Sequence, residues 1–408
     1  MKTCLVVLTD KYPFGDGGAF VENEHYFWNK YDRVLICPVM ANNEDIISSD
    51  FALYENEVLI ESFEKKYNIF GKIFNLFGVV SLCECIMELR NVSCFSMFKT
   101  FVFSIYLINS RFKRIYKHVK KYLINDEISN VTIYAYWLYE PAQVGVFLKK
   151  YIKKINKNVV LISRAHGYDL YEERQKDYYF PFRDLVLNST DKILPISEMG
   201  KNYLNKKYNY KFNDKIQVSR LGCYKLFENN SQKTDNRIVI VSCSNLVPLK
   251  RIEKLIDFFC QYEKEVDWFH FGEGELYNKL VNYSNKLPDN ISLSFMGYVS
   301  NDILQLFYSN NYIDFFINVS ETEGIPVSIM EAFSYGIPVI ATDVGGVSEI
   351  VYSKKNGVLL NVDFSYDELK IAIDDVIIHG DKYRIEAFET WKRLSDARKV
   401  YKEFINLI

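Results

Sequence analysis

Residues 321–346 read ETEGIPVSIMEAFSYGIPVIATDVGG and predict a turn, a helix and a buried strand in succession. The apolar run IDFFINVS stands directly before this stretch and predicts a further strand. Gly324 permits a sharp turn, Pro326 suits the first turn of a helix, and Gly336 ends that helix. The apolar run PVIATD then follows. The order of strand, turn, helix and strand is the repeating unit of a parallel α/β sheet.

Two glutamates in this stretch, Glu323 and Glu331, stand eight residues apart. Glu323 falls on the loop after the first strand and Glu331 one to two turns into the helix, at the edge where parallel sheets bind ligands. Carboxylates repel phosphates but accept hydrogen bonds, so a ribose diol and a hexose hydroxyl suit them. Gly345 and Gly346 can offer backbone amides to an anion. Alternatively, both glutamates are solvated surface residues and the glycines only form turns.

Short apolar or aromatic runs alternate with helical patterns along most of the 408 residues. This alternation predicts βαβ units and parallel sheets. The length exceeds what one hydrophobic core usually supports, so we expect two domains. The polar run FENNSQKTDNR, at 227–237, is interpreted as the linker between domains at 1–226 and 236–389. A helical pattern at about 390–408 is suited to packing back on the first domain.

The composition is that of a globular protein, with 49% apolar and 25% charged residues. The formal net charge of −2 gives no reason to expect a nucleic-acid partner. The eight cysteines form no Cys-x-x-Cys pair, so we interpret them as small buried hydrophobes in a reducing compartment. The first apolar run is too short for a signal peptide, and no window reaches the roughly 18 apolar residues of a spanning helix. We expect a cytoplasmic protein, free or at the inner face of the cell membrane.

The segment at residues 111–123, RFKRIYKHVKKYL, is both apolar and strongly basic. Its apolar side chains recur at helical spacing, and six lysines and arginines occupy the other side. A basic amphipathic helix can lie on an anionic membrane, where each basic residue contributes about 1 kcal/mol. The alternative is a domain helix with a solvated charged face.

Two further strand ends carry residues suited to phosphate. Lys250 and Arg251 follow the strand IVIVSC and the loop SNLVPL, at the start of the next helix. Cations there can engage a diphosphate by charge-assisted hydrogen bonds, or they cap the helix in solvent. Near the start of the chain, FGDGGAFVENE follows the first strand, and Gly17 and Gly18 open a helix in the geometry by which amides approach phosphate. This segment is not a Gly-x-Gly-x-x-Gly motif.

These motifs together carry a family resemblance. The Glu-x7-Glu element in EGIPVSIMEAFSYGIPVIATDVGG, with SNLVPLKR upstream and SRAHGYDLY in the first half, resembles the retaining nucleotide-sugar glycosyltransferases of family 4, the group 1 glycosyl transferases. The resemblance covers most of the chain and is thin from about 41 to 130. It implies the GT-B fold: α/β, with two Rossmann-like doubly wound parallel-sheet domains facing a central cleft. The first would bind the acceptor and the second the nucleotide sugar.

The resemblance implies a role for each matching residue. Glu331 would accept from the ribose hydroxyls of the nucleotide, and Glu323 would hold a hydroxyl of the donor sugar. Lys250 and Arg251 would neutralise the diphosphate as the sugar leaves. His166, at the end of a first-domain strand, would sit over the donor sugar; alternatively, it is a hydrogen-bonded strand-end histidine. The implied donor site consists of Gly17, Gly18, Asn245, Lys250, Arg251, Glu323, Gly324, Ile325, Pro326 and Glu331, with His166, Glu323 and Lys250 as catalytic candidates.

One residue departs from the family pattern. Many members have Arg where this chain has Asn245, two residues after the strand, and that Arg helps to hold the diphosphate. The contact would then rest on Lys250, Arg251 or another cation such as Arg164, with the amides of Gly17–Gly18 close to the same phosphates.

The resemblance also implies transfer without a metal or a resident cofactor. Family members are thought to retain anomeric configuration by attack on the face that the nucleotide leaves, with a diphosphate oxygen taking the acceptor's proton. No side-chain base is then needed. This agrees with a sequence that has no Asp-x-Asp or His-x-x-x-His motif.

The leading interpretation is therefore a transferase that moves a sugar from a UDP- or GDP-sugar to a saccharide. By extension the acceptor is lipid-linked, and the pathway makes a bacterial capsule, exopolysaccharide or O-antigen. Family members recognise acceptors in the thin region, so residues 67–123 are a candidate for acceptor or membrane contact. One alternative is a non-catalytic binding subunit of this fold, which Asn245 favours. Others are a nucleotide-sugar epimerase and a phosphorylase, against which the Glu-x7-Glu context argues.

Overall fold

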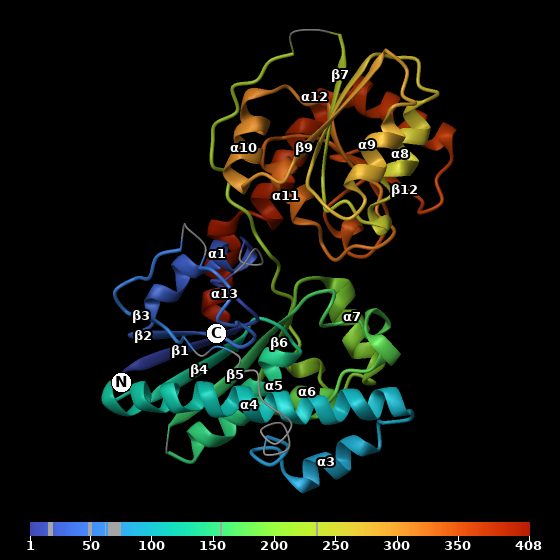
Figure 1. Ribbon diagram of the computed structural model, residues 1–408. Coiled ribbons are helices and arrows are strands. Elements are labelled where there is room, and N and C mark those ends of the chain that lie inside the picture. Colours follow the sequence, from blue (N-terminus) through green and yellow to red (C-terminus); the bar gives the residue numbers. More distant parts are fainter. Residues whose placement is uncertain (15–18, 48–50, 62, 64–74, 156, 234–235) are drawn as a thin grey trace. The chain divides into compact units, whose positions relative to one another are not determined.

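The computed structural model describes residues 1–14, 19–47, 51–61, 63, 75–155, 157–233 and 236–408. The chain divides into two compact units (Figure 1), the first made of Met1–Ser219 with Tyr401–Ile408 and the second of Arg220–Val400. Each unit contains a six-stranded sheet whose paired strands, among the residues described, all run parallel. The predicted fold class, α/β with two doubly wound parallel sheets, is confirmed.

The sheet of the first unit has the order β3-β2-β1-β4-β5-β6. Its strands are β1 (Thr3–Thr9), β2 (Arg33–Pro38), β3 (Glu57–Leu59), β4 (Asn130–Ala135), β5 (Asn158–Ala165) and β6 (Lys192–Pro195). The longer helices of this unit are α1 (Ala19–His25), α3 (Leu82–Leu89), α4 (Phe95–Asn125), α5 (Glu140–Lys153), α6 (Arg183–Ser189) and α7 (Glu198–Lys207). Strand β1, TCLVVLT, is buried from its second residue onward, as expected where helices cover both faces of a parallel sheet.

The sheet of the second unit has the order β12-β11-β10-β7-β8-β9. Its strands are β7 (Ile238–Cys243), β8 (Val266–Phe271), β9 (Ile291–Gly297), β10 (Phe315–Asn318), β11 (Val339–Thr342) and β12 (Gly357–Leu360). Its helices are α8 (Ile252–Phe259), α9 (Tyr277–Ser284), α10 (Asn301–Asn310), α11 (Val327–Ser334) and α12 (Tyr366–Leu394). The strand order reverses between β7 and β10, so the carboxyl ends of these two strands form the edge at which open α/β sheets bind ligands.

The stretch 321–346 folds as its sequence predicts. It leaves β10, turns, and forms α11 from Val327 to Ser334. Gly336 then takes a φ of +68°, a conformation that favours glycine, and the amide of Ile337 returns to the carbonyl of Ala332 to close the helix. Strand β11 follows at once. The predicted strand, turn, helix and strand are confirmed.

The division between the units falls before the predicted linker at 227–237. The chain already pairs with the second unit at the amide of Leu226, which donates to Gln305 Oε1, and at the amide of Phe227, which donates to the Tyr335 hydroxyl. At the other end, helix α13 (Ala397–Leu407) begins in the second unit, and the chain joins the first unit from Tyr401. There the ring of Phe404 packs 5.1 Å from that of Tyr134.

Residues 111–123 form the last part of α4, and their apolar side chains face inward. Phe112, Ile115, Val119 and Leu123 are all buried in the core of the first unit. The hydrophobic side of this segment is therefore occupied by the protein, and the alternative of a domain helix with a solvated charged face is correct for it. Arg111 is also buried and pairs with Glu140 at 3.1 Å. The exposed basic residues of the segment are Lys113, Lys117, Lys120 and Lys121.

The eight cysteines are all free, but they are not all buried. Cys4, Cys37 and Cys223 lie in the interior as predicted, and Cys85, Cys243 and Cys260 are half-buried. Cys83 on α3 and Cys94 directly before α4 are exposed. The prediction of small buried hydrophobes is therefore wrong for these two. In the described part of the chain, every helix is too short or too polar to cross a membrane.

Candidate functional site

A pocket opens at the reversal point of the second sheet, between the carboxyl ends of β7 and β10. It is lined by Ser242, Cys243, Ser244, Lys250, Ile252, Leu255, Ile317, Asn318, Val319 and Ser320. Its walls come from the two strand ends, the loop after each strand and the start of α8. The chain therefore places a pocket where the doubly wound topology predicts a ligand.

Two of the predicted catalytic residues meet at this pocket. The ammonium group of Lys250 donates to Glu323 Oε1 at 2.5 Å, and the side-chain amide of Asn318 donates to the same oxygen at 3.2 Å. Both charged side chains are mostly buried. The pair combines one cation for an anionic ligand with a carboxylate for hydroxyl groups, held at one edge of the sheet.

Gly345 and Gly346 let the loop after β11 pack against the loop that carries Glu323. A Cβ atom on Gly345, whose φ is +59°, would lie 2.0 Å from the Glu323 carbonyl oxygen. The amide of Gly346 donates to the carbonyl of Gly324 at 2.7 Å. That amide is already used within the protein, so the prediction that it serves an anion is wrong for Gly346. The glycines instead fix the loop of Glu323, Gly324 and Ile325.

Glu331 lies on α11 and is buried, with 9% of its surface exposed. Burial raises the pKa of its carboxyl to about 7, and a hydrogen bond from the side-chain amide of Asn301 acts in the opposite direction. The ionisable groups in electrostatic range are Cys223, Cys243 and Tyr308. Cys243 at the end of β7 is also within range of Lys250. Glu331 is therefore not the solvated carboxylate of the alternative interpretation.

The support of Glu331 continues through a chain of side chains that leads from the exposed Asn301 to the buried Gln305 and Tyr335. Asn301 accepts from Gln305 at 2.6 Å, and Gln305 accepts from the Tyr335 hydroxyl at 3.0 Å. Asn301 and Gln305 stand one turn apart at the start of α10. Neither was predicted from the sequence, because polar residues at the start of a helix are ordinary there and only the fold shows that they face Glu331.

Arg251 uses its guanidinium to join two loops. Its Nε donates to the carbonyl of Val319 at 2.6 Å and its Nη1 to the carbonyl of Val362 at 2.7 Å. The Nη2 nitrogen is buried without a hydrogen-bond partner among the described residues. Two of the guanidinium nitrogens that were predicted to contact a diphosphate therefore bind the loops after β10 and β12 instead.

The other predicted donor residues of the second unit lie on the loops after β7 and β10. Asn245 follows β7 and is exposed. Gly324 and Ile325 belong to the loop held by the glycine pair, and Pro326 immediately precedes α11 with a φ of −72°. Gly17 and Gly18 lie outside the described residues. Among those described, no group of three or more histidine, cysteine, aspartate or glutamate side chains is placed to hold a metal ion.

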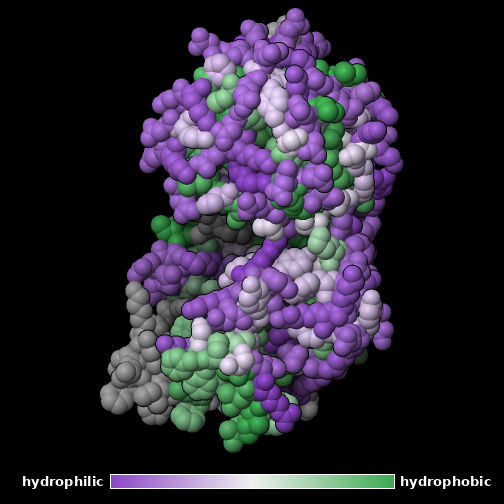
Figure 2. Space-filling view, turned by 90° about the vertical axis from the view of Figure 1, so that its right-hand side faces the viewer, coloured by the Kyte–Doolittle hydropathy of each residue, from purple (hydrophilic) through white to green (hydrophobic). Residues whose placement is uncertain are grey.

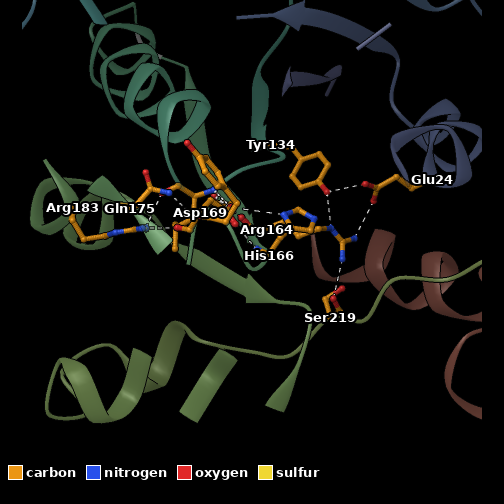
Figure 3. Close-up of polar contacts among 11 residues, drawn as sticks. Glu24, Tyr134, Arg164, His166, Asp169, Gln175, Arg183 and Ser219 are labelled. Carbon is orange, nitrogen blue, oxygen red and sulfur yellow. Dashed lines mark hydrogen bonds and ion pairs between the residues drawn. The ribbon is translucent and has the colours of Figure 1, made fainter. Parts of the chain in front are cut away.

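His166 lies in the first unit, directly after β5 (Figure 3). Its backbone amide donates to Asp169 Oδ1 at 2.7 Å. The imidazole is buried beside the rings of Tyr136 and Trp137, with centroids 4.9 and 4.3 Å away, and its two nitrogens have no hydrogen-bond partner among the described residues. The alternative of a hydrogen-bonded strand-end histidine is therefore wrong for the ring, whose Nδ1 instead lies 3.8 Å from Asp169 Oδ2.

Arg164 is a structural residue of the first unit. Its side chain is fully buried and points toward Glu24, Tyr134 and Ser219 (Figure 3). It pairs with Glu24 at 3.0 Å and donates to the Tyr134 hydroxyl at 2.9 Å and to the Ser219 carbonyl at 2.8 Å. The suggestion that Arg164 takes part in a diphosphate contact is wrong, because these partners enclose it.

The hydroxyl of Tyr134 connects the two charges of this cluster, so its removal tests the cluster's contribution to stability. The hydroxyl donates to Glu24 Oε1 at 3.0 Å and accepts from Arg164. We expect Tyr134→Phe to lower the free energy of unfolding by about 1–3 kcal/mol, because a buried charged group loses a partner. Urea unfolding followed by circular dichroism measures the change. Tyr298→Phe is the control, because Tyr298 exposes 69% of its surface, and equal stability of the two variants would contradict the prediction.

Comparison with known proteins connects this geometry to an activity. The model of the family "glycosyl transferases group 1" matches residues 225–387. An uncharacterised glycosyltransferase of Methanocaldococcus jannaschii is 28% identical over 314 residues, which cover 73% of this chain and 80% of that protein. The O-antigen biosynthesis glycosyltransferase WbnH of Escherichia coli is 30% identical over 116 residues, 28% of this chain and 31% of that protein.

Two solved structures share the fold along the whole chain. One is the apo form of the lipopolysaccharide outer core galactosyltransferase WaaB, with a TM-score of 0.66, 16% identity and coverage of 99% of this chain and 98% of that one. The other is HepE of Anabaena in complex with UDP, with a TM-score of 0.64, 16% identity and coverage of 100% and 99%. At these identities the likeness concerns the fold.

Proposed function

We propose that the protein transfers a sugar, with retention of configuration, from a nucleotide diphosphate sugar to a saccharide acceptor, because the model of the group 1 glycosyl transferases matches residues 225–387. The observation that carries this proposal is the contact between Lys250 and Glu323 at the reversal point of the sheet, with Glu331 buried on the adjoining helix. A cation and two carboxylates in this arrangement match the diphosphate, the sugar and the ribose of such a donor.

In the proposed complex, Lys250 exchanges its contact with Glu323 for the diphosphate. The bond between the anomeric carbon and the diphosphate oxygen breaks, the acceptor oxygen bonds to the same face of that carbon, and the acceptor's proton passes to the diphosphate. Lys250 stabilises the negative charge that develops on the leaving group. We assign the diphosphate to Lys250 rather than Arg251, because Arg251 is committed to two carbonyl groups.

The two carboxylates serve the neutral parts of the donor in this proposal. Glu323 accepts from a hydroxyl of the sugar and Glu331 from the ribose diol. We assign a further sugar hydroxyl to His166, since a buried imidazole that forms no hydrogen bond among the described residues gains from one. No step requires a metal ion or a resident cofactor.

The donor base and the pathway follow from relatives. A UDP complex of HepE supports UDP as the nucleotide, with GDP as the second candidate. The name of WbnH, an O-antigen biosynthesis glycosyltransferase, supports a place in bacterial surface polysaccharide assembly, for which we propose a lipid-linked saccharide as the acceptor. We further propose that the four exposed lysines at 113–121 contact an anionic membrane electrostatically. The free cysteines agree with a cytoplasmic location at its inner face.

Thermal denaturation with nucleotides tests the proposal. We expect one of UDP, GDP or ADP at 1 mM to raise the melting temperature by about 3–8 °C, as for a ligand present at 10 to 100 times its Kd. The same shift should persist in EDTA, because the proposed site uses Lys250 in place of a metal. A shift that EDTA abolishes would refute metal independence. No shift with any nucleotide would favour the non-catalytic binding subunit.

A further inference from the structure

Helix α3 presents its hydrophobic side to solvent. Leu82, Ile86, Met87 and Leu89 are all exposed, and Leu82 exposes 76% of its surface. Figure 2 shows hydrophobic side chains gathered at the end of the first unit where α3 lies. A surface helix normally turns such residues toward the core, so an exposed group of them indicates a surface with a partner.

The acidic residues of α3 point the other way, into the protein. Glu88 is buried and accepts from the Tyr179 hydroxyl at 2.6 Å. Glu84 accepts from the Ser81 backbone amide and hydroxyl at the start of the helix and pairs with Lys150 at 3.3 Å. These contacts fix the rotation of the helix about its axis. The outward direction of the apolar side chains is therefore built into the fold.

The first part of α4 extends this surface. Phe95 and Phe98 are exposed, and Phe95 exposes 72% of its surface. We name Leu82, Ile86, Met87, Leu89, Phe95 and Phe98 the apolar patch. At 3.6 residues per turn, Phe95 and Phe98 lie on the same exposed side of α4 as Lys113, Lys117 and Lys120.

The exposed charges of the segment that carries the apolar patch have one sign, while exposed Asp184 of α6 lies in electrostatic range of Glu88. Between residues 75 and 125, the side chains described as exposed and charged are Arg90, Lys99, Lys113, Lys117, Lys120 and Lys121. Glu84 and Glu88 are the acidic residues of this range, and both are held by the inward contacts given above. An exposed apolar surface that continues along α4 into a row of lysines, with the carboxylates of the same segment turned inward, complements an anionic lipid surface.

We propose that the apolar patch docks the first unit on an anionic membrane, with its six side chains at the level of the headgroups and upper acyl chains. The lysines of α4 contact the headgroups. A second copy of this chain suits the surface less well, because a symmetric contact would bring the basic borders of two patches together. The inference concerns a different unit from the donor site and holds or fails independently of sugar transfer.

Co-sedimentation with vesicles tests the proposal on the full chain. Vesicles of phosphatidylcholine alone are compared with vesicles containing 30% phosphatidylglycerol, at about 0.1 M salt. The test variant is Leu82→Ser/Ile86→Ser/Phe95→Ser. The matched control is Ile371→Ser/Ile378→Ser/Ile385→Ser, which removes three comparably exposed side chains from α12 of the second unit. We expect the test variant to lose at least tenfold in partitioning onto the anionic vesicles, and the control to bind like the wild type.

The outcomes separate lipid from other partners. Wild-type protein that stays in the supernatant with anionic vesicles would overturn the proposal, and so would a test variant that sediments like the wild type. A dimer that forms without vesicles and dissociates in the test variant, measured by analytical ultracentrifugation, would assign the patch to a second copy. An unchanged melting temperature of the test variant shows that binding was not lost through unfolding.

A fluorescence measurement reports insertion directly. Phe95→Trp places an indole on the patch, while Trp28, Trp268 and Trp391 are buried elsewhere. We expect its emission to shift to shorter wavelength on addition of anionic vesicles, relative to wild-type protein that retains its native Trp137 as background. An emission spectrum that vesicles leave unchanged would mean that Phe95 does not enter the lipid.

Discussion

Lys250→Ala is expected to lower kcat/KM for sugar transfer by about 100- to 1,000-fold, the usual effect of removing a group that stabilises charge in the transition state. Under the proposed function, Lys250 is the principal cation at the diphosphate because Asn245 is uncharged and Arg251 is bound to two carbonyl groups. Loss of Lys250 therefore leaves little to stabilise the negative charge that develops on the departing nucleotide diphosphate. Initial rates with the nucleotide sugar identified by thermal denaturation measure the effect.

Lys254→Ala is the matched control for this prediction. Lys254 lies one turn further along α8, and its ammonium group rests over the ring of Phe364 at 3.7 Å instead of facing the pocket. We expect its substitution to leave kcat/KM within about twofold of the wild type, as for a surface change away from the site. Comparable losses in the two variants would mean that general positive charge, and not a placed cation, supports transfer.

A double-mutant cycle separates catalysis from structure at the same pair. Lys250 and Glu323 are in direct contact, so each substitution alone also disrupts an ion pair. If Lys250 acted only by holding Glu323, the variant Lys250→Ala/Glu323→Ala would transfer no more slowly than Glu323→Ala. We expect the double variant to be slower than either single one, because the two residues contact different parts of the donor.

The fold was predictable from the sequence because its signals are local. The alternation of apolar runs and helical patterns predicts parallel sheets, and Pro326 and Gly336 bracket α11 within a residue. Glu323 and Glu331 were located by the same reasoning. A strand–helix unit fixes which residues reach the carboxyl edge of a sheet, so candidates at that edge are visible in sequence.

What the sequence did not reveal depends on contacts between distant segments. Arg164 follows the pattern of a strand-end cation, yet Glu24, 140 residues away, encloses it. Asn318 contacts Glu323 only because β10 ends at the pocket, and Asn301 supports Glu331 from another helix. Periodicity reports which face of an element is buried, but it carries no information about the partner on the other side.

The direction of α3 shows the same limit in a different form. Its apolar residues recur as in any amphipathic helix, and the pattern alone favours burial of that side. The contacts of Glu84 and Glu88 instead turn the apolar side of the helix toward solvent. These contacts depend on Lys150 and Tyr179 from remote segments. Residues 111–123 have the opposite outcome, with the apolar side buried. Composition therefore identified the region of the proposed membrane contact but not the surface within it.

Glu331→Ala is expected to weaken nucleotide binding by about 100- to 10,000-fold at pH 8, since two charge-assisted hydrogen bonds of about 1.5–3 kcal/mol each are lost with the carboxylate. Isothermal titration with the stabilising nucleotide measures the Kd. Glu349→Ala is the control, because Glu349 is paired with Arg220 in the same unit. An unchanged Kd in Glu331→Ala would contradict the proposal that Glu331 binds the ribose.

The pH dependence of binding follows from the raised pKa of Glu331. Its carboxyl has a pKa of about 7 in the unliganded protein, so it is largely protonated at pH 6 and ionised at pH 8. The thiols of Cys223 and Cys243 and the phenol of Tyr308 stay neutral in this range because burial raises their pKa values. Nucleotide affinity of the wild type should therefore fall by up to about tenfold per pH unit below pH 7. A flat profile between pH 6 and 8 would contradict the ribose role.

The stability of the unliganded protein should change in the opposite direction. A carboxyl whose pKa is higher in the folded than in the unfolded state favours folding below its unfolded pKa, and this contribution is lost as the pH rises through about 7. Glu331→Gln keeps the shape but cannot ionise, so at pH 8 it should be more stable than the wild type while binding nucleotide more weakly and without dependence on pH. Urea unfolding at pH 6 and pH 8 measures the first effect and titration the second. If Glu331 serves ligand binding, its buried carboxylate lowers the stability of the unliganded protein, and Glu331→Gln restores that stability at pH 8. If Glu331 has only a structural role, Glu331→Gln should lower stability at both pH values.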